Sequence, residues 1–306
     1  MRHHFSQYHR ESFQKQRLAK LAKILESLPS RRLCDVLLRA FLLSVSPIIP
    51  LVLVSDFKER YKVFWKHRSK RGNAAEDEEY VYEADPSFVC LLWAVLYAGA
   101  VAASPAMLAE ASFRIANRPA FLARMRDKTD AAIEAYCGRN MQFPALSGLV
   151  ASLIAHQCDP TIDPLVDEAP FIARSFQGAR ALGLSHEAVL AAMPPADAEI
   201  GRRVWYNLLD MEVMSTIRCG ASPSGHGCER GFDTRAPRGE EDTASFVLTV
   251  AQRRMTSVVR CIIQTRGAGD DNDDDTSGPE AVAQLADEIE QFDSFIDELV
   301  VCLLRR

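Results

Sequence analysis

The sequence predicts an all-α protein, an irregular multi-helix domain whose helices lie in antiparallel pairs. Two observations lead to this fold class. Apolar residues recur at spacings of three and four through most of the chain, which is the period of an amphipathic helix. The alternating β-branched runs and Asn-Gly turns that indicate strands are poorly represented. With 306 residues, of which 48% are hydrophobic and 25% charged, the chain has an ordinary globular composition and can bury a large core.

The first predicted helices alternate with proline breaks. Residues 11–28 place leucines at helical spacing with lysines between them, and we assign residues 1–27 to a basic N-terminal helical segment. A second helix begins after Pro29 and meets a break at Pro47 and Pro50. The next helix, over residues 55–67, carries aromatic residues at spacings of four and three. Residues 28–306 form the main helical region.

Residues 86–108 raise the question of a membrane span, because they carry no charge for more than twenty residues. Ser104-Pro105 interrupts this stretch, small residues fill its second half, and no basic flank anchors it. These features favour a buried helix of an all-α core over a membrane helix.

The rest of the chain continues with helices separated by polar loops. A loop rich in Gly, Pro, Ser and charge is expected over residues 219–242, and an acidic loop follows residue 266. The further helices are predicted at 118–140, 144–158, 170–193, 199–213, 244–265 and 281–306.

Charge is distributed unevenly along the chain. Residues 1–72 carry 16 Lys/Arg and 5 Asp/Glu, whereas the remaining residues carry 20 and 36. The basic end could meet nucleic acid or pair with the acidic body. Within it, the sequence KHRSKR is a candidate nuclear-import signal, and its alternative interpretation is a solvated flank of a loop. Its basic residues are Lys66, Arg68, Lys70 and Arg71.

Motifs of enzymes and metal sites are missing. The eight cysteines are scattered without a CxxC pair, so no metal site is expected. GASPS places Ser224 where a nucleophile elbow needs its last glycine, and neither a phosphate-binding loop nor HExxH occurs. The acidic run DDNDDD fails the EF-hand spacing in both registers. The chain is therefore not expected to be an enzyme or to hold a cofactor.

The helix over residues 199–213 carries an unusual number of charges for an apolar element. Glu199 lies three and four residues before Arg202 and Arg203, a favourable order for ion pairs within a helix. Asp210 lies too far along the helix to bond Arg203, so we expect it to order a neighbouring element. Trp205 is expected in the core. The charges therefore position the helix; an alternative is that both arginines bind DNA phosphates.

This stretch resembles the middle homology region of fungal zinc binuclear-cluster transcription factors. The resemblance rests on LGLSH at residues 182–186 and EIGRRVWYNLLD at residues 199–210, with supporting similarity from about residue 28 to residue 265. Gly201 and Tyr206 depart from the family pattern, and the six-cysteine zinc cluster is absent. The residues that match the family motif are Gly183, Glu199, Arg202, Arg203, Trp205 and Asp210.

The resemblance implies a transcription regulator of the nucleus, in which residues 28–306 form a C-terminally short middle homology region. Such regions restrain activation, bind partners and sense small molecules, in metabolic or secondary-metabolite pathways. The implied partners are proteins or a full-length transcription factor, with a small-molecule effector, DNA only indirectly, and no membrane. Zinc is expected only if a six-cysteine module precedes this chain. The alternative is a helical ligand-binding or scaffold protein with no role in transcription.

Overall fold

The protein is all-α in its computed structural model, as the periodicity predicts. The structure describes residues 19–70, 86–138, 145–219 and 232–238, and shorter pieces within 251–262 and 283–294. Every regular element in these residues is a helix, and no strand occurs among them. The predicted antiparallel pairing stays a prediction.

The chain forms two compact units, residues 1–161 and residues 162–306. The sequence analysis does not anticipate a division at Thr161. Its own boundary, between residues 27 and 28, stays a prediction. Leu21 and Leu25, which belong to the basic N-terminal segment, are fully buried within the first unit.

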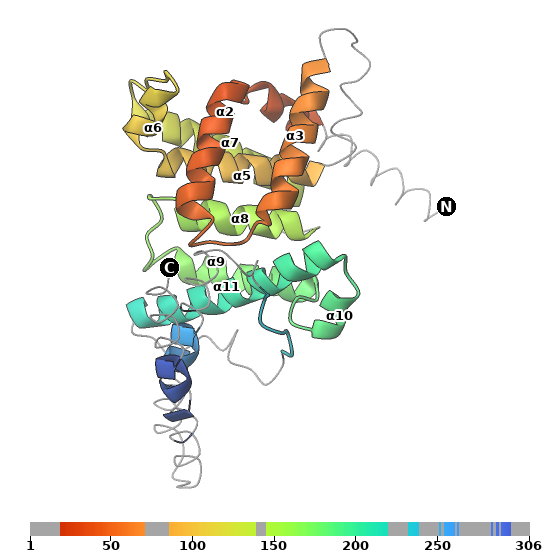
Figure 1. Cartoon of the computed structure of the whole chain (residues 1–306), viewed down its shortest axis with the longest axis vertical. Coiled ribbons are helices and arrows are strands. Elements are labelled where there is room, and N and C mark those ends of the chain that lie inside the picture. Colours follow the sequence, from red (N-terminus) through yellow and green to blue (C-terminus); the bar gives the residue numbers. More distant parts are fainter. Residues whose placement is uncertain are drawn as a thin grey trace, which may run out of the picture. The chain divides into compact units, whose positions relative to one another are not determined.

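Helix α5 (Pro86–Ala102) is the centre of the first unit. It contacts α2 (Arg31–Ala40), the π-helical turn η1 (Phe41–Val45), α7 (Arg118–Cys137) and α8 (Leu146–Cys158). In Figure 1, α2 and α3 (Val54–Lys70) stand across α5 and α8. Neighbours on several sides explain why α5 is apolar all round, since thirteen of its residues are buried.

The uncharged stretch over residues 86–108 is two helices. The α5 helix ends at Ala102, and α6 (Pro105–Glu110) begins after Ser104, whose hydroxyl accepts a hydrogen bond from the Met107 amide at 3.2 Å. Arg118 donates to the carbonyls of Ala100, Val101 and Ala103 at the end of α5. No helix in the described parts of the chain is both long and apolar enough to cross a membrane.

A single glycine sets the approach of α2 to α5. A Cβ atom added at Gly99 would lie 2.0 Å from the carbonyl oxygen of Leu37 and 2.7 Å from its carbonyl carbon. Backbone atoms of α2 therefore touch α5 at this point, and the close contact requires a residue without a side chain.

The aromatic residues of α3 face the core, as their spacing predicts. Phe57, Tyr61, Phe64 and Trp65 are all at most 7% exposed. The Tyr61 hydroxyl donates to Asp35 at 2.7 Å, which ties α3 to α2. Burial raises the pKa of Tyr61 well above its ordinary range, and the bond to Asp35 raises it further.

The second unit is built from α9 (Glu168–Ala181), α10 (Glu187–Ala191) and α11 (Pro195–Cys219). The single helix predicted over residues 170–193 is wrong: α9 ends at Ala181. Gly183, with φ of +75°, is in the left-handed conformation that glycine adopts without strain. The Leu184 amide bonds the Ala179 carbonyl and the Gly183 amide bonds the Arg180 carbonyl, which is the Schellman motif.

Helix α11 is buried more widely than one stripe. The predicted stripe is largely present, with Val204, Leu208 and Met211 buried and Ile200 partly exposed. Trp205 and Leu209, on another side of the helix, are also at most 3% exposed. Helix α9 and residues 232–238 pack on this second buried side. The spacing of residues within one helix does not predict these contacts.

Candidate functional site

The site begins with a close contact between α10 and α11. A Cβ atom at Gly201 would lie 2.6 Å from Cδ2 of Leu190 and 3.2 Å from Cδ2 of Leu184. Gly201 costs about 1 kcal/mol of helix propensity relative to alanine. Here the missing side chain allows α10 and the preceding turn to pack directly on α11. The departure from the family pattern thus has a packing reason.

Two glutamates and two arginines form a partly buried network beside this contact. Arg202 donates to both carboxylate oxygens of Glu187, at 3.2 Å from Nε and 2.5 Å from Nη2. Arg203 Nε lies 2.9 Å from Glu199, as the spacing predicts, and Arg202 lies 4.0 Å from Glu199. All four side chains are between 10% and 17% exposed. Both guanidiniums are therefore engaged by carboxylates of the same unit.

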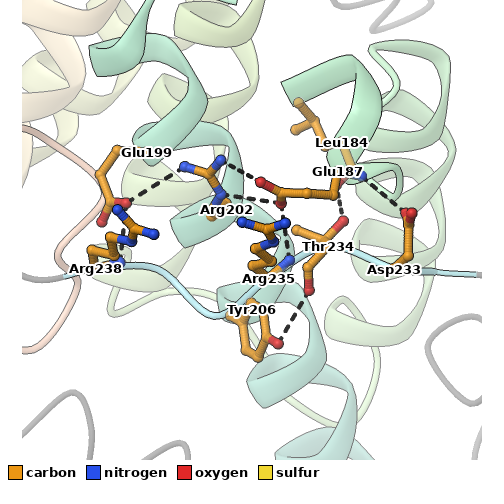
Figure 2. Close-up of polar contacts among 9 residues, drawn as sticks. All are labelled: Leu184, Glu187, Glu199, Arg202, Tyr206, Asp233, Thr234, Arg235 and Arg238. Atoms are coloured by element: carbon orange, nitrogen blue, oxygen red, sulfur yellow. Dashed lines mark hydrogen bonds and ion pairs between the residues drawn. The ribbon is translucent and has the colours of Figure 1, made fainter. Parts of the chain in front are cut away.

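Residues 232–238, FDTRAPR, lie across α10 and α11 and are called the strap below (Figure 2). The Asp233 amide bonds the Ser185 carbonyl at 3.1 Å, and its carboxylate accepts the Glu187 amide at the start of α10 at 2.9 Å. The Thr234 hydroxyl donates to the Leu184 carbonyl at 2.7 Å, and the Thr234 carbonyl accepts from Tyr206. The strap is thus bonded to elements that precede it by about 30 to 50 residues.

The two glutamates also hold the strap through its backbone. The Arg235 amide donates to Glu187 at 3.0 Å, and the Arg238 amide donates to Glu199 at 3.1 Å. Glu187 therefore accepts from the Arg202 side chain and one amide of the strap, as Figure 2 shows. Glu199 accepts from the Arg203 side chain and the second amide of the strap. Hydrogen bonds with one ionised partner are the stronger kind, so the network holds α10, α11 and the strap together.

Trp205 lies on the apolar side of the same helix. Its ring packs edge-on against Phe176 of α9, with 5.4 Å between ring centroids, and against Phe232 of the strap at 5.6 Å. Trp205 is 1% exposed, and its indole N–H has no hydrogen-bond acceptor among the residues that the structure describes. The aromatic contacts therefore join α9, α11 and the strap on the apolar side of α11.

The bonds to Glu187 change its acidity. The hydrogen bond from Arg202, followed by the one from the Arg235 amide, lowers the pKa of Glu187 to about 2. The same pairing raises the pKa of Arg202. Because the pKa of Glu187 is lower in the folded state, its ionisation stabilises the fold above pH 4.5, and this contribution disappears as the pH falls from about 4.5 to about 2.

We expect Glu187→Gln to lower the free energy of unfolding at neutral pH and to flatten its dependence on pH between about 4.5 and about 2. The amide cannot pair with Arg202 as an anion and does not titrate. Urea denaturation across this pH range measures the effect. Glu110→Gln, at the exposed end of α6, is the control and should retain the parent's pH dependence. A parental slope in Glu187→Gln would contradict the assignment.

The structure brings most of the motif residues together. Gly183, Glu199, Arg202, Arg203 and Trp205 all lie at the junction of α9, α10, α11 and the strap. Asp210, two turns further along α11, is buried at 9% exposure. The sequence analysis missed Glu187, Asp233 and Thr234. The sequence shows Glu187 directly after LGLSH, and it places Asp233 and Thr234 in the loop expected over residues 219–242, but only the fold brings them together.

Arg203→Ala and Asp210→Ala are each expected to lower the free energy of unfolding by about 1–3 kcal/mol. Arg203→Ala leaves the partly buried Glu199 without this partner, and Asp210→Ala removes a polar group that is itself buried. Thermal melting and urea denaturation measure the loss. Arg124→Ala, exposed on α7, serves as control. Parental stability of Arg203→Ala together with loss of salt-dependent DNA binding would show instead that this arginine contacts phosphate.

The candidate import signal is only partly described. Lys66 is exposed, whereas Arg68 is half-buried, donates to the Leu25 carbonyl at 3.2 Å and lies over the Trp65 ring. Lys70 ends α3, and Arg71 lies outside the described residues. Arg68 thus has a structural contact, and the import role of the group stays a prediction.

Cysteine and histidine side chains form no metal cluster in the parts of the chain that the structure describes. Cys34 and Cys90 are buried, as their apolar surroundings predict, and burial raises the pKa of Cys34 to about 12. Cys219 is exposed at the end of α11. Cys228, Cys261 and Cys302 lie outside the described residues.

Comparison with known proteins gives three informative similarities. The chain is 29% identical over 216 residues to the transcription factor macR of Penicillium terrestre, and 29% identical over 202 residues to the transcription factor yanR of Aspergillus niger. It is 26% identical over 213 residues to the transcriptional regulatory protein C139.03 of Schizosaccharomyces pombe. These homologues are fungal transcription regulators.

The similarity covers much of this chain and little of its relatives. It includes 65% of the chain for macR and yanR and 69% for C139.03, but only 23%, 24% and 31% of those proteins. The chain thus spans about a quarter to a third of their length. No family model and no solved structure matches it. The similarity supports a role in transcription regulation, as the motif residues predict.

Proposed function

We propose that this chain is a regulatory region of a fungal transcription regulator and acts through protein partners, with a small-molecule effector as a further input. The observation that carries the proposal is the similarity to fungal transcription factors over 65% of the chain. The charged signature residues of α11 support it, because they pair with Glu187 and Glu199 and hold the strap in place. The charges of α11 thus hold α10, α11 and the strap together.

A tethering experiment tests this function. The full chain is joined to an unrelated DNA-binding domain, and a reporter gene carrying that domain's site is measured in a fungal host. We expect reporter output to change several-fold relative to the DNA-binding domain alone, at equal protein level. Thr234→Val, which removes the bond to the Leu184 carbonyl, should reduce the change, whereas Arg124→Ala should retain it. Unchanged output, with the chain excluded from the nucleus when untethered, would favour a scaffold outside transcription.

As part of the same proposal, the chain itself holds no zinc. Its cysteines lack the closely spaced triplets of a binuclear cluster. Elemental analysis of the purified chain should give well below one zinc ion per molecule after dialysis against a weak chelator. One or more retained zinc ions per chain would contradict this expectation.

A further inference from the structure

The first unit carries a concentration of basic side chains where three helices meet. The described residues 19–70 include eleven Lys/Arg and four Asp/Glu. Arg68 of α3 bonds the Leu25 carbonyl of the helix formed by residues 19–26, and both Arg68 and Arg31 of α2 lie 5.9 Å from the centre of the Trp65 ring. These contacts bring together the end of the first helix, the start of α2 and the end of α3. We call Lys23, Arg31, Arg32, Lys66 and Arg68 the basic corner.

The acidic residues of the same segment offset the charge of the corner only in part. Asp35 accepts the Tyr61 hydroxyl, Asp56 pairs with Arg60, and Glu59 pairs with Lys62, within or beside α3. Glu26 is the remaining carboxylate of the described residues 19–70, and it is exposed on the first helix. Glu26 and Asp35 lie beside the corner and offset two of its five charges. Among the described residues 19–70 the corner therefore keeps a positive excess, and four of its five basic residues are exposed.

Two of these positions are unfavourable for the fold itself. Arg31 and Arg32 occupy the first turn of α2, which contains no acidic residue. A helix start carries positive partial charge, so cations there reduce stability and anions increase it. The placement raises the positive potential of the corner instead of stabilising α2, which is expected for a surface that binds an anion.

The chemistry of the corner favours a polyanion without an apolar component. Trp65, Leu21 and Leu25 are at most 6% exposed, and Phe113, over which Arg32 lies, is only partly exposed, so the accessible groups of the corner are mainly cationic. Acidic peptide partners generally add apolar contacts, whereas a nucleic-acid backbone offers regularly spaced phosphates to Lys and Arg. Arginine, which supplies three of the five residues, suits phosphate because its planar fork can donate two bonds.

We propose that the basic corner binds the phosphate backbone of duplex nucleic acid, independently of base sequence. This contact would hold the regulatory region beside DNA without reading bases. It is separate from the α11 arginines, which the glutamates engage.

Fluorescence anisotropy tests the proposal with the full chain and a 30-base-pair duplex, over about 50 to 200 mM NaCl. The duplex is roughly ten times as long as the 3 base pairs that one small module reads. Affinity should fall with salt, with a logarithmic slope of about −4.5 for five phosphate contacts. The triple variant Lys23→Gln/Arg31→Gln/Lys66→Gln should reduce that slope by about 3. The control Lys58→Gln/Arg124→Gln/Arg174→Gln removes the same charge from exposed positions away from the corner and should match the parent.

Circular dichroism and thermal melting serve to check that both variants fold. Equal slopes for the corner and control variants would overturn the proposal, as would no salt-dependent binding by the parent. Tighter binding to polyglutamate of equal length would also overturn it and assign the corner to an acidic protein. Reporter activity in the tethering experiment does not depend on this contact, so the two proposals can fail separately.

Discussion

Replacing Trp205 with alanine should lower the free energy of unfolding by about 3–5 kcal/mol, which is the usual loss for a large aromatic side chain in a core. Trp205 is 1% exposed and joins α9, α11 and the strap through Phe176 and Phe232. Its removal leaves a cavity that two flexible rings cannot fill completely. Urea denaturation followed by circular dichroism measures the loss.

Trp205→Phe separates packing from hydrogen bonding. The indole N–H of Trp205 bonds to no acceptor in the described part of the chain, so phenylalanine removes a buried donor that makes no bond there. The loss should therefore be clearly smaller than for alanine. A loss below about 1 kcal/mol for Trp205→Ala would contradict its place in the core.

Gly99→Ala should destabilise the first unit by about 3 kcal/mol or more, at the upper end of overpacking effects. The added Cβ would meet the backbone of Leu37 at 2.0 Å, so α2 must move away from α5. Helix propensity alone predicts the opposite sign, because alanine is better than glycine in a helix by about 1 kcal/mol. Thermal melting of the variant therefore distinguishes the two effects by direction.

Gly148→Ala is the matched comparison within the same unit. Its Cβ would meet side-chain atoms, Cys137 Sγ at 2.8 Å and Tyr136 at 3.1 Å, which can move more easily than backbone. Its loss should be smaller than that of Gly99→Ala. A Gly99→Ala variant that melts at or above the parent temperature would show that α2 does not approach α5 as closely as described.

The sequence predicted secondary-structure elements better than it predicted the contacts between them. Hydrophobic spacing is a local signal, so the all-α class, the aromatic face of α3 and the Glu199–Arg203 pair could be found without a structure. The partner of Arg202 could not, because Glu187 lies 15 residues earlier, beyond a glycine turn. The end of α9 at Ala181 was missed because LGLSH continues an apolar pattern while Gly183 reverses the chain.

The strap shows the same limit more sharply. A loop rich in Gly, Pro and charge predicts a surface segment, and Asp233 and Arg235 are indeed exposed. Thr234 is nevertheless buried at 4%, because its hydroxyl reaches the Leu184 carbonyl, 50 residues earlier. Long-range bonds of this kind leave no periodic trace in the sequence. Similarly, the cost of Gly201 in a helix has an explanation only once Leu190 is placed against it.

The way the glutamates hold the strap also determines which changes the strap tolerates. Glu187 and Glu199 accept the main-chain amides of residues 235 and 238, a donor that nineteen of the twenty common amino acids supply. The attachment of the strap therefore tolerates almost any side chain at these two positions. Proline is the exception, because it has no amide hydrogen. The proline already present, Pro237, stands between them. Variation in the strap can alter the surface offered to partners while its attachment to α10 and α11 stays the same.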